Sequence, residues 1–263
     1  MKSTRLVRKI AFGAIPFLAI MIVWYFVYHF DQSATRLVPS PVETGSAFLR
    51  LMMNGTLPKL ILASLLNLIP PFILAAVCAV AFGTMLGINR TVHKIFYPIL
   101  SAIYPVPSLA WLPFIIMFLG FTRDAIWFVI FISSFVRMIY NVIGGVQNVN
   151  VEYVLAAKNL GFNKLKIVLD VILPSAFPQI ITGLRVGFGS AWRSLIGAEM
   201  LVVTFGGLGK FIWMSQSNFS FDNVIAGIVV ISAISILIEE LVFKRLERST
   251  LIKWGFIRED YDI

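Results

Sequence analysis

The chain has 263 residues, of which 59% are hydrophobic and only 13% are charged, and its mean hydropathy is +0.88. A typical soluble domain carries about 25% charged residues, so this chain lacks the charge to cover a water-soluble fold of its size. The net charge of +9 does not indicate a nucleic-acid partner, because the basic residues lie in short segments between apolar runs. We therefore interpret the chain as a multi-pass protein of the cell (inner) membrane, with lipid as its solvent.

Six segments are apolar over the roughly 20 residues that a spanning helix needs. They are approximately residues 10–30, 60–88, 96–119, 125–145, 177–203 and 224–243. The first follows a basic N-terminus, as in a signal peptide, but it is too long for one and no A-x-A cleavage site follows. We expect an all-α membrane protein with six transmembrane helices in a single domain, residues 1–263.

The distribution of Lys and Arg predicts the orientation of these spans. With the N-terminus in the cytoplasm, 14 of the 22 basic residues fall in inner segments, five in outer segments and three within spans. This asymmetry predicts that both termini are cytoplasmic. The two long connections are then an extracytoplasmic loop, residues 31–59, and a cytoplasmic loop, residues 146–174. In the outer loop, residues 42–53 are weakly amphipathic and are expected to lie along the membrane surface.

The inner loop has apolar residues at roughly helical spacing, interrupted by Gly161 and Asn163. This pattern predicts a helix–turn–helix, with Ala156 and Ala157 on the first helix and Gly161 as a C-terminal cap of positive φ. An apolar stripe outside the bilayer must be buried, either in a groove on a cytoplasmic partner or on the protein's own inner surface. Periodicity alone leaves both interpretations open.

The string AAKNLG, residues 156–161, is followed after nine residues by VILP, residues 171–174. Together they resemble the EAA signature of the permease subunits of ABC importers. The matching positions are Ala156, Ala157, Gly161, Leu173 and Pro174. Leu155 departs from the signature, which usually has Glu there, and Glu152 lies three residues earlier on about the same helical face.

Further strings, such as YPVPSLAWLP at residues 104–113 and AEM at residues 198–200, are similar to the nitrate, sulfonate and taurine branch of that family. The resemblance implies a type I ABC importer permease fold and a small, anionic solute. It also implies coupling of residues 146–174 to cytoplasmic ATPase subunits, a second permease subunit forming a homodimer, and an extracytoplasmic substrate-binding protein. The chain itself would catalyse nothing and hold no cofactor, with ATP and Mg bound in the partner ATPase.

Prolines interrupt the third span, and we interpret its centre at Pro105 and Pro107 as lining the translocation pathway, in preference to a simple packing kink. In the fifth span, Gly183 and Gly187 have the spacing of a close helix contact. Ionisable side chains within spans are candidates for function. The further pathway candidates are Arg137, Arg185, Trp192, Arg193 and Glu199, and three arginines against one glutamate favour an anion.

A self-sufficient secondary transporter or channel is the alternative function. Proton- or ion-coupled transporters carry acidic or His relays within their spans, and here only Glu199 is available. The single cysteine, Cys78, excludes an intrachain disulfide or a thiolate metal cluster. The string GGLGK at residues 206–210 lacks the first Gly and the Ser/Thr of a Walker A motif, and we interpret it as a turn before the sixth span.

Overall fold

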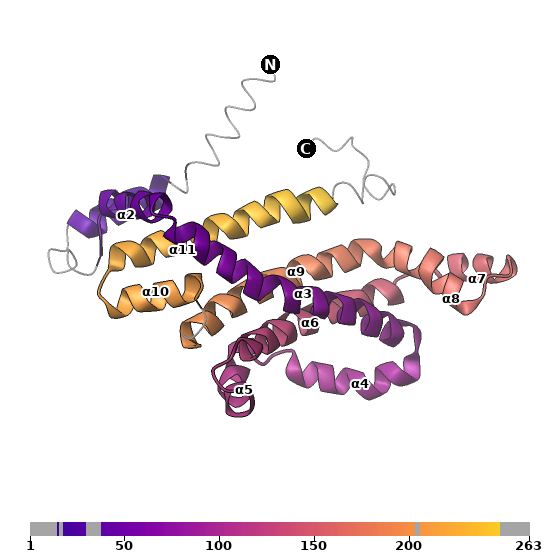
Figure 1. Ribbon diagram of the computed structural model, residues 1–263. Helices are drawn as coiled ribbons and strands as arrows, with labels where there is room; N and C mark the ends of the chain where they lie inside the picture. Colours follow the sequence, from indigo (N-terminus) through magenta and orange to yellow (C-terminus); the bar gives the residue numbers. More distant parts are fainter. Residues whose placement is uncertain (1–14, 16–17, 30–37, 203–205, 248–263) are drawn as a thin grey trace, which may run out of the picture. The chain divides into compact units, whose positions relative to one another are not determined.

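The computed structural model describes residue 15 and residues 18–29, 38–202 and 206–247, and the regular structure in these residues is helical (Figure 1). Parts of the predicted first span (residues 10–14, 16–17 and 30), the start of the outer loop and both basic chain ends lie outside the described residues. The all-α prediction is confirmed for the described part of the chain.

Among the described residues, four helices are long and apolar enough to cross a membrane, namely Thr56–Ile88, Arg123–Gln147, Lys164–Leu201 and Phe221–Glu247. Their positions confirm the second, fourth, fifth and sixth predicted spans to within a few residues, except that the fifth begins earlier. A fifth candidate is the bent pair Arg90–Ile103 and Ser108–Leu119. The apolar helix Leu18–His29 lies within the predicted first span but is shorter than a span requires.

The chain divides into two compact units, the first made of residues 1–60 and 211–231. In this unit α2 (Pro41–Met53) confirms the helix expected in the outer loop. Ser40 and Glu43 form a capping box at its start, each side chain bonding to the other residue's backbone N–H. Arg50, near the other end of α2, pairs at 3.4 Å with Asp222 at the start of α11 (Phe221–Ile238).

The second unit, residues 61–210 and 232–263, is built around close contacts between α3 (Thr56–Ile88), α6 (Arg123–Gln147) and α9 (Leu173–Leu201). A Cβ added to Gly83 of α3 would lie 2.7 Å from Val142 of α6. One added to Gly187 of α9 would lie 2.5 Å from Met138 of α6. One added to Gly183 would lie 2.9 Å from Asn141 of α6, so the contacts at Gly183 and Gly187 confirm that their pattern serves helix packing, as small residues do in membrane interiors.

We expect Gly187→Ala to destabilise the protein by about 1–3 kcal/mol, because the added methyl group would overpack the α6–α9 contact. Gly189 lies two residues away on the same helix, and a Cβ there would meet its nearest side-chain atom at an ordinary 3.6 Å. Gly189→Ala is therefore the matched control. Thermal unfolding of the purified protein measures both, and equal shifts for the two variants would contradict the packing argument.

The third predicted span, residues 96–119, is not one helix. The structure has α4 (Arg90–Ile103), a short 3₁₀ turn at Ser108–Trp111 and α5 (Leu112–Leu119), with a bend of 90° between the two parts. Asn89 caps α4, accepting the N–H groups of Thr91 and Val92, so the helix also begins earlier than predicted. Pro105 and Pro107 have no N–H to continue the helix, which accounts for the break between α4 and the 3₁₀ turn.

The inner loop folds as α7 (Val151–Asn159), a turn at Gly161, and α8 (Lys164–Ile167). The sequence predicted a helical hairpin separate from a span that begins near residue 177. The second helix of that hairpin is not separate from the span. From α8 the chain continues through a π-helical turn, Val168–Ile172, into α9, so that Lys164–Leu201 runs without a break. In an α-helix the ring of Pro174 would clash with the carbonyl of Asp170, and the wider π turn lies at that carbonyl.

The GGLGK string is likewise not only a turn. Its last three residues begin α10 (Leu208–Ser217), a helix that precedes α11.

Candidate functional site

The turn between α7 and α8 is defined by side-chain caps. Asn150 accepts the N–H of Glu152 at 2.9 Å, and Asn163 accepts the N–H of Lys166 at 2.8 Å. Between the helices, Gly161 has a φ of +80°, a left-handed conformation that glycine adopts without a Cβ penalty. The sequence prediction of a glycine C-cap at this position is confirmed.

The helical turn buries one face and exposes another. Ala157 and Ile167 are each 5% exposed and pack in one cluster with Val142 and Ala176 of the spans. By contrast, Leu155, Leu160 and Leu165 are 51%, 75% and 67% exposed. Part of the apolar stripe therefore packs on the protein's own helices, as one interpretation predicts. Burial of the uncovered part in a groove on a partner stays a prediction.

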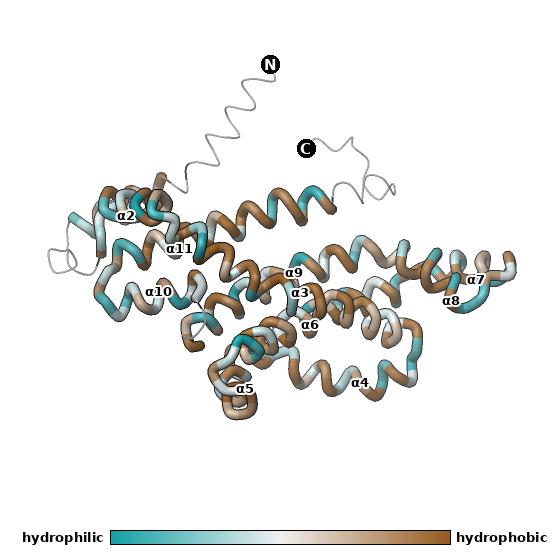
Figure 2. The backbone as a smooth tube through the Cα atoms, viewed as in Figure 1, coloured by the Kyte–Doolittle hydropathy of each residue, from teal (hydrophilic) through white to brown (hydrophobic). Residues whose placement is uncertain are grey.

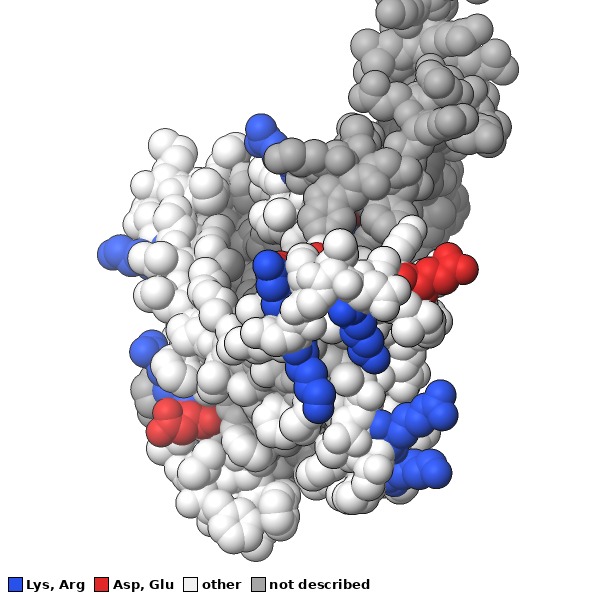
Figure 3. Space-filling view, turned by 90° about the vertical axis from the view of Figure 1, so that its right-hand side faces the viewer, with Lys and Arg blue, Asp and Glu red and all other residues white. Residues whose placement is uncertain are grey.

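The residues predicted to couple the chain to ATPase subunits include both exposed and half-buried side chains. Glu152 and Ala156 are exposed on α7, whereas Leu173 and Pro174 are half-buried at the start of α9. Figure 3, which views the end of the molecule that carries the α7–α8 turn, shows more basic than acidic side chains. Lys158, Lys164 and Lys166 of this turn are exposed, so a partner surface that binds here is expected to be acidic around an apolar centre.

The bend between α4 and α5 encloses a small polar cavity. Its volume is about 20 Å³, enough for one water-sized group. Pro105 and Pro107 lie in the bend beside it and are exposed. The cavity is lined by Ile103, Tyr104, Val106, Ser108, Ile132, Ser133, Val136, Arg137 and Ser190.

Arg137 is the charged group of this cavity. Its guanidinium carbon lies 4.4 Å from the centre of the Tyr104 ring, in a cation–π contact across the bend. No carboxylate of the described residues forms an ion pair with it. Sequence reasoning selected Arg137 by its position in a span, and the structure places it where the neighbouring helix is broken.

The other predicted residues of α9 have different surroundings. Arg185 pairs with Glu239 and, at 3.3 Å, with Glu247, both at the end of the last long helix. Trp192 is buried, stacks against Phe188 at 6.4 Å, and its Nε1–H has no hydrogen-bond partner among the described residues. The candidates therefore do not converge on one point.

Arg193, the most central of the α9 cations, is exposed on the surface of the chain. It makes no ion pair with the described residues, Glu199 included. Ser64, Asn67 and Gly209 bond to the Glu199 carboxylate instead, so a pairing of Arg193 with Glu199 is not supported within the chain. Assignment of Arg185, Trp192, Arg193 and Glu199 to the translocation pathway stays a prediction.

Glu199 is fully buried, with 0% exposure, and its carboxylate accepts from donors on two other segments. Ser64 Oγ donates to it at 2.9–3.1 Å and Asn67 Nδ2 at 3.1 Å, both from α3. The backbone N–H of Gly209 donates at 3.0 Å, and that of Leu208 donates at 2.9 Å to Ser64 Oγ. This network ties the end of α9 to α3 and to the start of α10.

Sequence reasoning missed the partners of Glu199. Ser64 and Asn67 are three residues apart in a mainly apolar helix, which places both on one face and was an available signal. Gly207 and Gly209 of the GGLGK string also have a structural role, since a Cβ on Gly207 would overlap the Glu199 carboxylate and one on Gly209 would overlap the Ile196 carbonyl. Their resemblance to a phosphate loop therefore reflects a cradle for a buried side chain.

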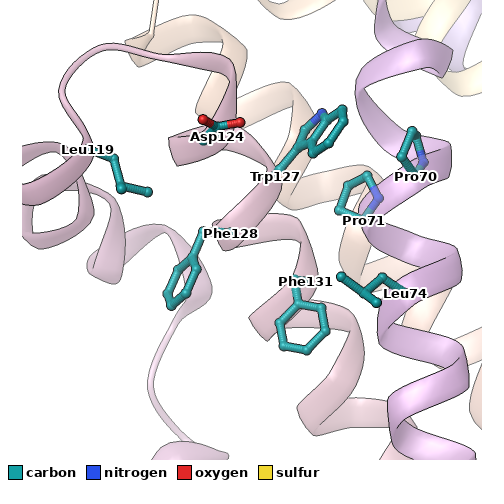
Figure 4. Close-up of a pocket in the computed structure, with 8 residues that line it drawn as sticks. All are labelled: Pro70, Pro71, Leu74, Leu119, Asp124, Trp127, Phe128 and Phe131. Carbon is teal, nitrogen blue, oxygen red and sulfur yellow. The ribbon is translucent and has the colours of Figure 1, made fainter.

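A larger cavity between α3, α5 and α6 has a different character (Figure 4). Its volume is about 550 Å³, and it is lined by Pro70, Pro71, Leu74, Leu119, Asp124, Trp127, Phe128 and Phe131. In Figure 4, Trp127 points from α6 toward the two prolines of α3, and Asp124 is the one charged group. Its apolar walls and single carboxylate make this cavity unsuited to an anion.

The fold and these sites define a class: a helical, multi-pass membrane protein with an exposed helical turn between α7 and α8 and a broken span. A family model described as "binding-protein-dependent transport system inner membrane component" matches residues 79–250. The chain belongs to this family. It is the permease subunit of an ABC importer, and this assignment displaces the alternative of a self-sufficient transporter or channel.

Individual relatives agree with the family. The chain is 29% identical to the taurine transport system permease protein of Escherichia coli, covering 92% of this chain and 89% of that one. It is 30% identical to the nitrate import permease protein of Leptolyngbya laminosa, covering 90% and 86%. A chain from an inward-facing structure of the MetNI methionine ABC transporter has the same fold, with a TM-score of 0.63, 16% identity, and coverage of 74% of this chain and 95% of that one.

Proposed function

We propose that the chain forms one half of the translocation pathway of its importer, in six spans with both termini in the cytoplasm. The four long apolar helices, the bent pair and the helix Leu18–His29 supply six apolar segments in the expected order. The excess of Lys and Arg in the inner segments supports this orientation. A second copy of the chain would supply the other half of the pathway.

The α7–α8 turn is the proposed docking site for cytoplasmic ATPase subunits. The observation that carries this proposal is the exposure of Leu155, Leu160 and Leu165 on a turn whose other face is firmly packed. An apolar surface of this kind, outside the bilayer, is stabilised by a groove on a partner. ATP and Mg would bind in the ATPase subunits, and this chain would hydrolyse nothing.

The proposed substrate is a small anionic solute, delivered to the outer side by an extracytoplasmic substrate-binding protein. The names of the relatives support this class, because taurine carries a sulfonate and nitrate is an oxyanion. Arg137 and Arg193, neither in an ion pair with the described residues, are cations available to such a solute. The proposed pathway residues are Pro105, Pro107, Arg137, Arg185, Trp192, Arg193 and Glu199.

Two single cysteines test the docking site and the orientation together, in a Cys78→Ser background. Leu160 is 75% exposed on the α7–α8 turn, and Met53 is 88% exposed at the end of α2. We expect Leu160→Cys to react with a membrane-impermeant maleimide only from the cytoplasmic side, and Met53→Cys only from outside. Binding of the ATPase subunits should protect Leu160→Cys and leave Met53→Cys reactive.

Labelling of Leu160→Cys from outside intact cells would contradict the orientation. Equal labelling of Leu160→Cys in the free chain and in the ATPase complex would contradict docking at this turn.

A further inference from the structure

The helix α4 has a continuous polar stripe. Arg90, His93, Tyr97, Ser101 and Tyr104 recur at intervals of three or four residues, which places them on one face, with Lys94 at its edge. The opposite face carries Ile95, Phe96 and Ile99, which are 61%, 42% and 53% exposed. In Figure 2 both hydrophobic and hydrophilic segments recur along α4, unlike the more uniformly apolar middle of α11.

The polar stripe faces α6. Tyr140 of α6 lies between its members, with its ring 5.9 Å from Tyr97 and 4.9 Å from Tyr104, and its hydroxyl 3.2 Å from Ser101 Oγ. An amphipathic helix lying on the membrane surface would direct its polar face to the headgroups. Here three members of that face contact Tyr140 of a spanning helix, so this part of the stripe is turned toward the protein and not toward the headgroups.

The stripe is nevertheless not sealed by these contacts. Tyr97 and Tyr104 are 43% and 39% exposed, and Ser101 is exposed as well. Polar side chains left open beside a spanning helix line either a wet passage or a polar partner surface. The stripe leads from the N-terminus of α4 to the bend, where Tyr104 and Arg137 line the small polar cavity.

The charged residues along the polar stripe and at the bend are all basic. Arg90 and Lys94 lie at one end and Arg137 at the other, and α4 contains neither Asp nor Glu. His93 stacks on Tyr97 at 4.8 Å. The planar guanidinium of Arg137 offers N–H groups in a geometry that suits an oxyanion. A hydrated anion is thus attracted at both ends, and no acidic residue of α4 repels it between them.

We propose that the polar stripe of α4, together with Tyr140 and Arg137, lines the inner half of a wet oxyanion pathway, and that Arg137 binds the anion at the bend. This inference rests on the proposed importer function, and it names the segment of the chain that carries the solute from mid-membrane to the cytoplasm.

Two cysteine variants in the Cys78→Ser background, studied in the complete transporter complex, test the proposal. Ser101→Cys lies on the stripe, and Ile99→Cys, two residues away on the apolar face, is the matched control. The probes are an anionic sulfonatoethyl and a cationic trimethylammonium methanethiosulfonate, each normalised to its rate with a free thiol. We expect Ser101→Cys to react at least about tenfold faster than Ile99→Cys, and faster with the anion, as a one-sign field directs ions.

Arg137→Met should move the anion-to-cation rate ratio at Ser101→Cys toward one, and trapping the ATPases with ATP should change the rate. Equal rates at Ser101→Cys and Ile99→Cys would overturn the proposal. If both reacted fast, α4 would lie on the protein surface, and if both reacted slowly, both of its faces would be closed to water. Preference for the cation would overturn the proposal too.

Uptake by the same complexes distinguishes a failure of the stripe proposal from a failure of the proposed importer function. Normal ATP-driven uptake with an unreactive Ser101→Cys overturns the stripe proposal alone. Ser101→Cys could react with a preference for the anionic probe while the Cys78→Ser parent shows no ATP-driven uptake. That result would overturn the proposed importer function but not the proposal that the stripe is wet.

Discussion

Replacing Glu199 by Met is expected to destabilise the permease by several kcal/mol and to abolish its assembly with partner subunits, because three buried donors lose their acceptor. Ser64 Oγ, Asn67 Nδ2 and the Gly209 N–H all bond to this carboxylate. A methionine fills a similar volume but accepts hydrogen bonds only weakly. The yield and thermal stability of the purified complex measure the effect.

Glu199→Gln is the graded comparison. Glutamine keeps one oxygen for Ser64 and Gly209, and the Asn67 amide can turn over, since its Oδ1 has no other partner among the described residues. We therefore expect Glu199→Gln to lose much less stability than Glu199→Met. Arg193→Met should leave assembly unchanged, because Arg193 is exposed and bonds to none of these groups. Equal losses for Glu199→Met and Arg193→Met would contradict the network and restore a pairing between these two residues.

Gly161→Asp is expected to uncouple ATP hydrolysis from transport by introducing a side chain and a negative charge into the α7–α8 turn. A loss of only about 1.4 kcal/mol of docking free energy weakens the ATPase contact tenfold. Binding-protein-stimulated ATP hydrolysis and solute uptake in reconstituted vesicles measure the coupling.

Gly55→Asp provides a control with the same backbone chemistry. Gly55 and Gly161 have φ values of +75° and +80°, and a Cβ at either would have open space around it. Aspartate is among the residues that tolerate this conformation, so backbone strain should be small and similar in both variants. Gly55→Asp should keep stimulated ATP hydrolysis, and an equal loss in both variants would mean that strain, not docking, is responsible.

The elements that depend on local composition could be predicted from sequence. Long apolar runs predicted the four long spans, and Gly161 with Asn163 predicted the turn of the inner loop. The size of the bend at Pro105 and Pro107 could not be predicted, because prolines specify where a helix breaks but not the angle between its parts. The unbroken run from α8 into α9 was missed because a π turn accommodates Pro174 where an α-helix would not.

The contacts of the candidate site were less predictable than its residues. Glu199 was recognised as an unusual buried acid, but its partners Ser64 and Gly209 are 135 and 10 residues distant along the chain. Arg185, Trp192 and Glu199 are seven residues apart, a spacing that places them on about the same face of a helix. The structure gives each a different neighbour: Arg185 pairs with Glu239 of the last long helix, Trp192 stacks on Phe188 of α9 itself, and Glu199 accepts a hydrogen bond from Ser64 of α3. Periodicity identifies a face but does not identify what packs against it.

The central claim, that this chain moves solute only when ATPase subunits act on it, is tested most directly by uptake into proteoliposomes. Vesicles would hold either the chain alone or the chain with its ATPase subunits and internal ATP, with the binding protein and the labelled anion that it binds outside. The account predicts uptake only with ATPase, ATP and binding protein together, and its loss with a non-hydrolysable ATP analogue. Accumulation by the chain alone, driven by an ion gradient, would contradict it.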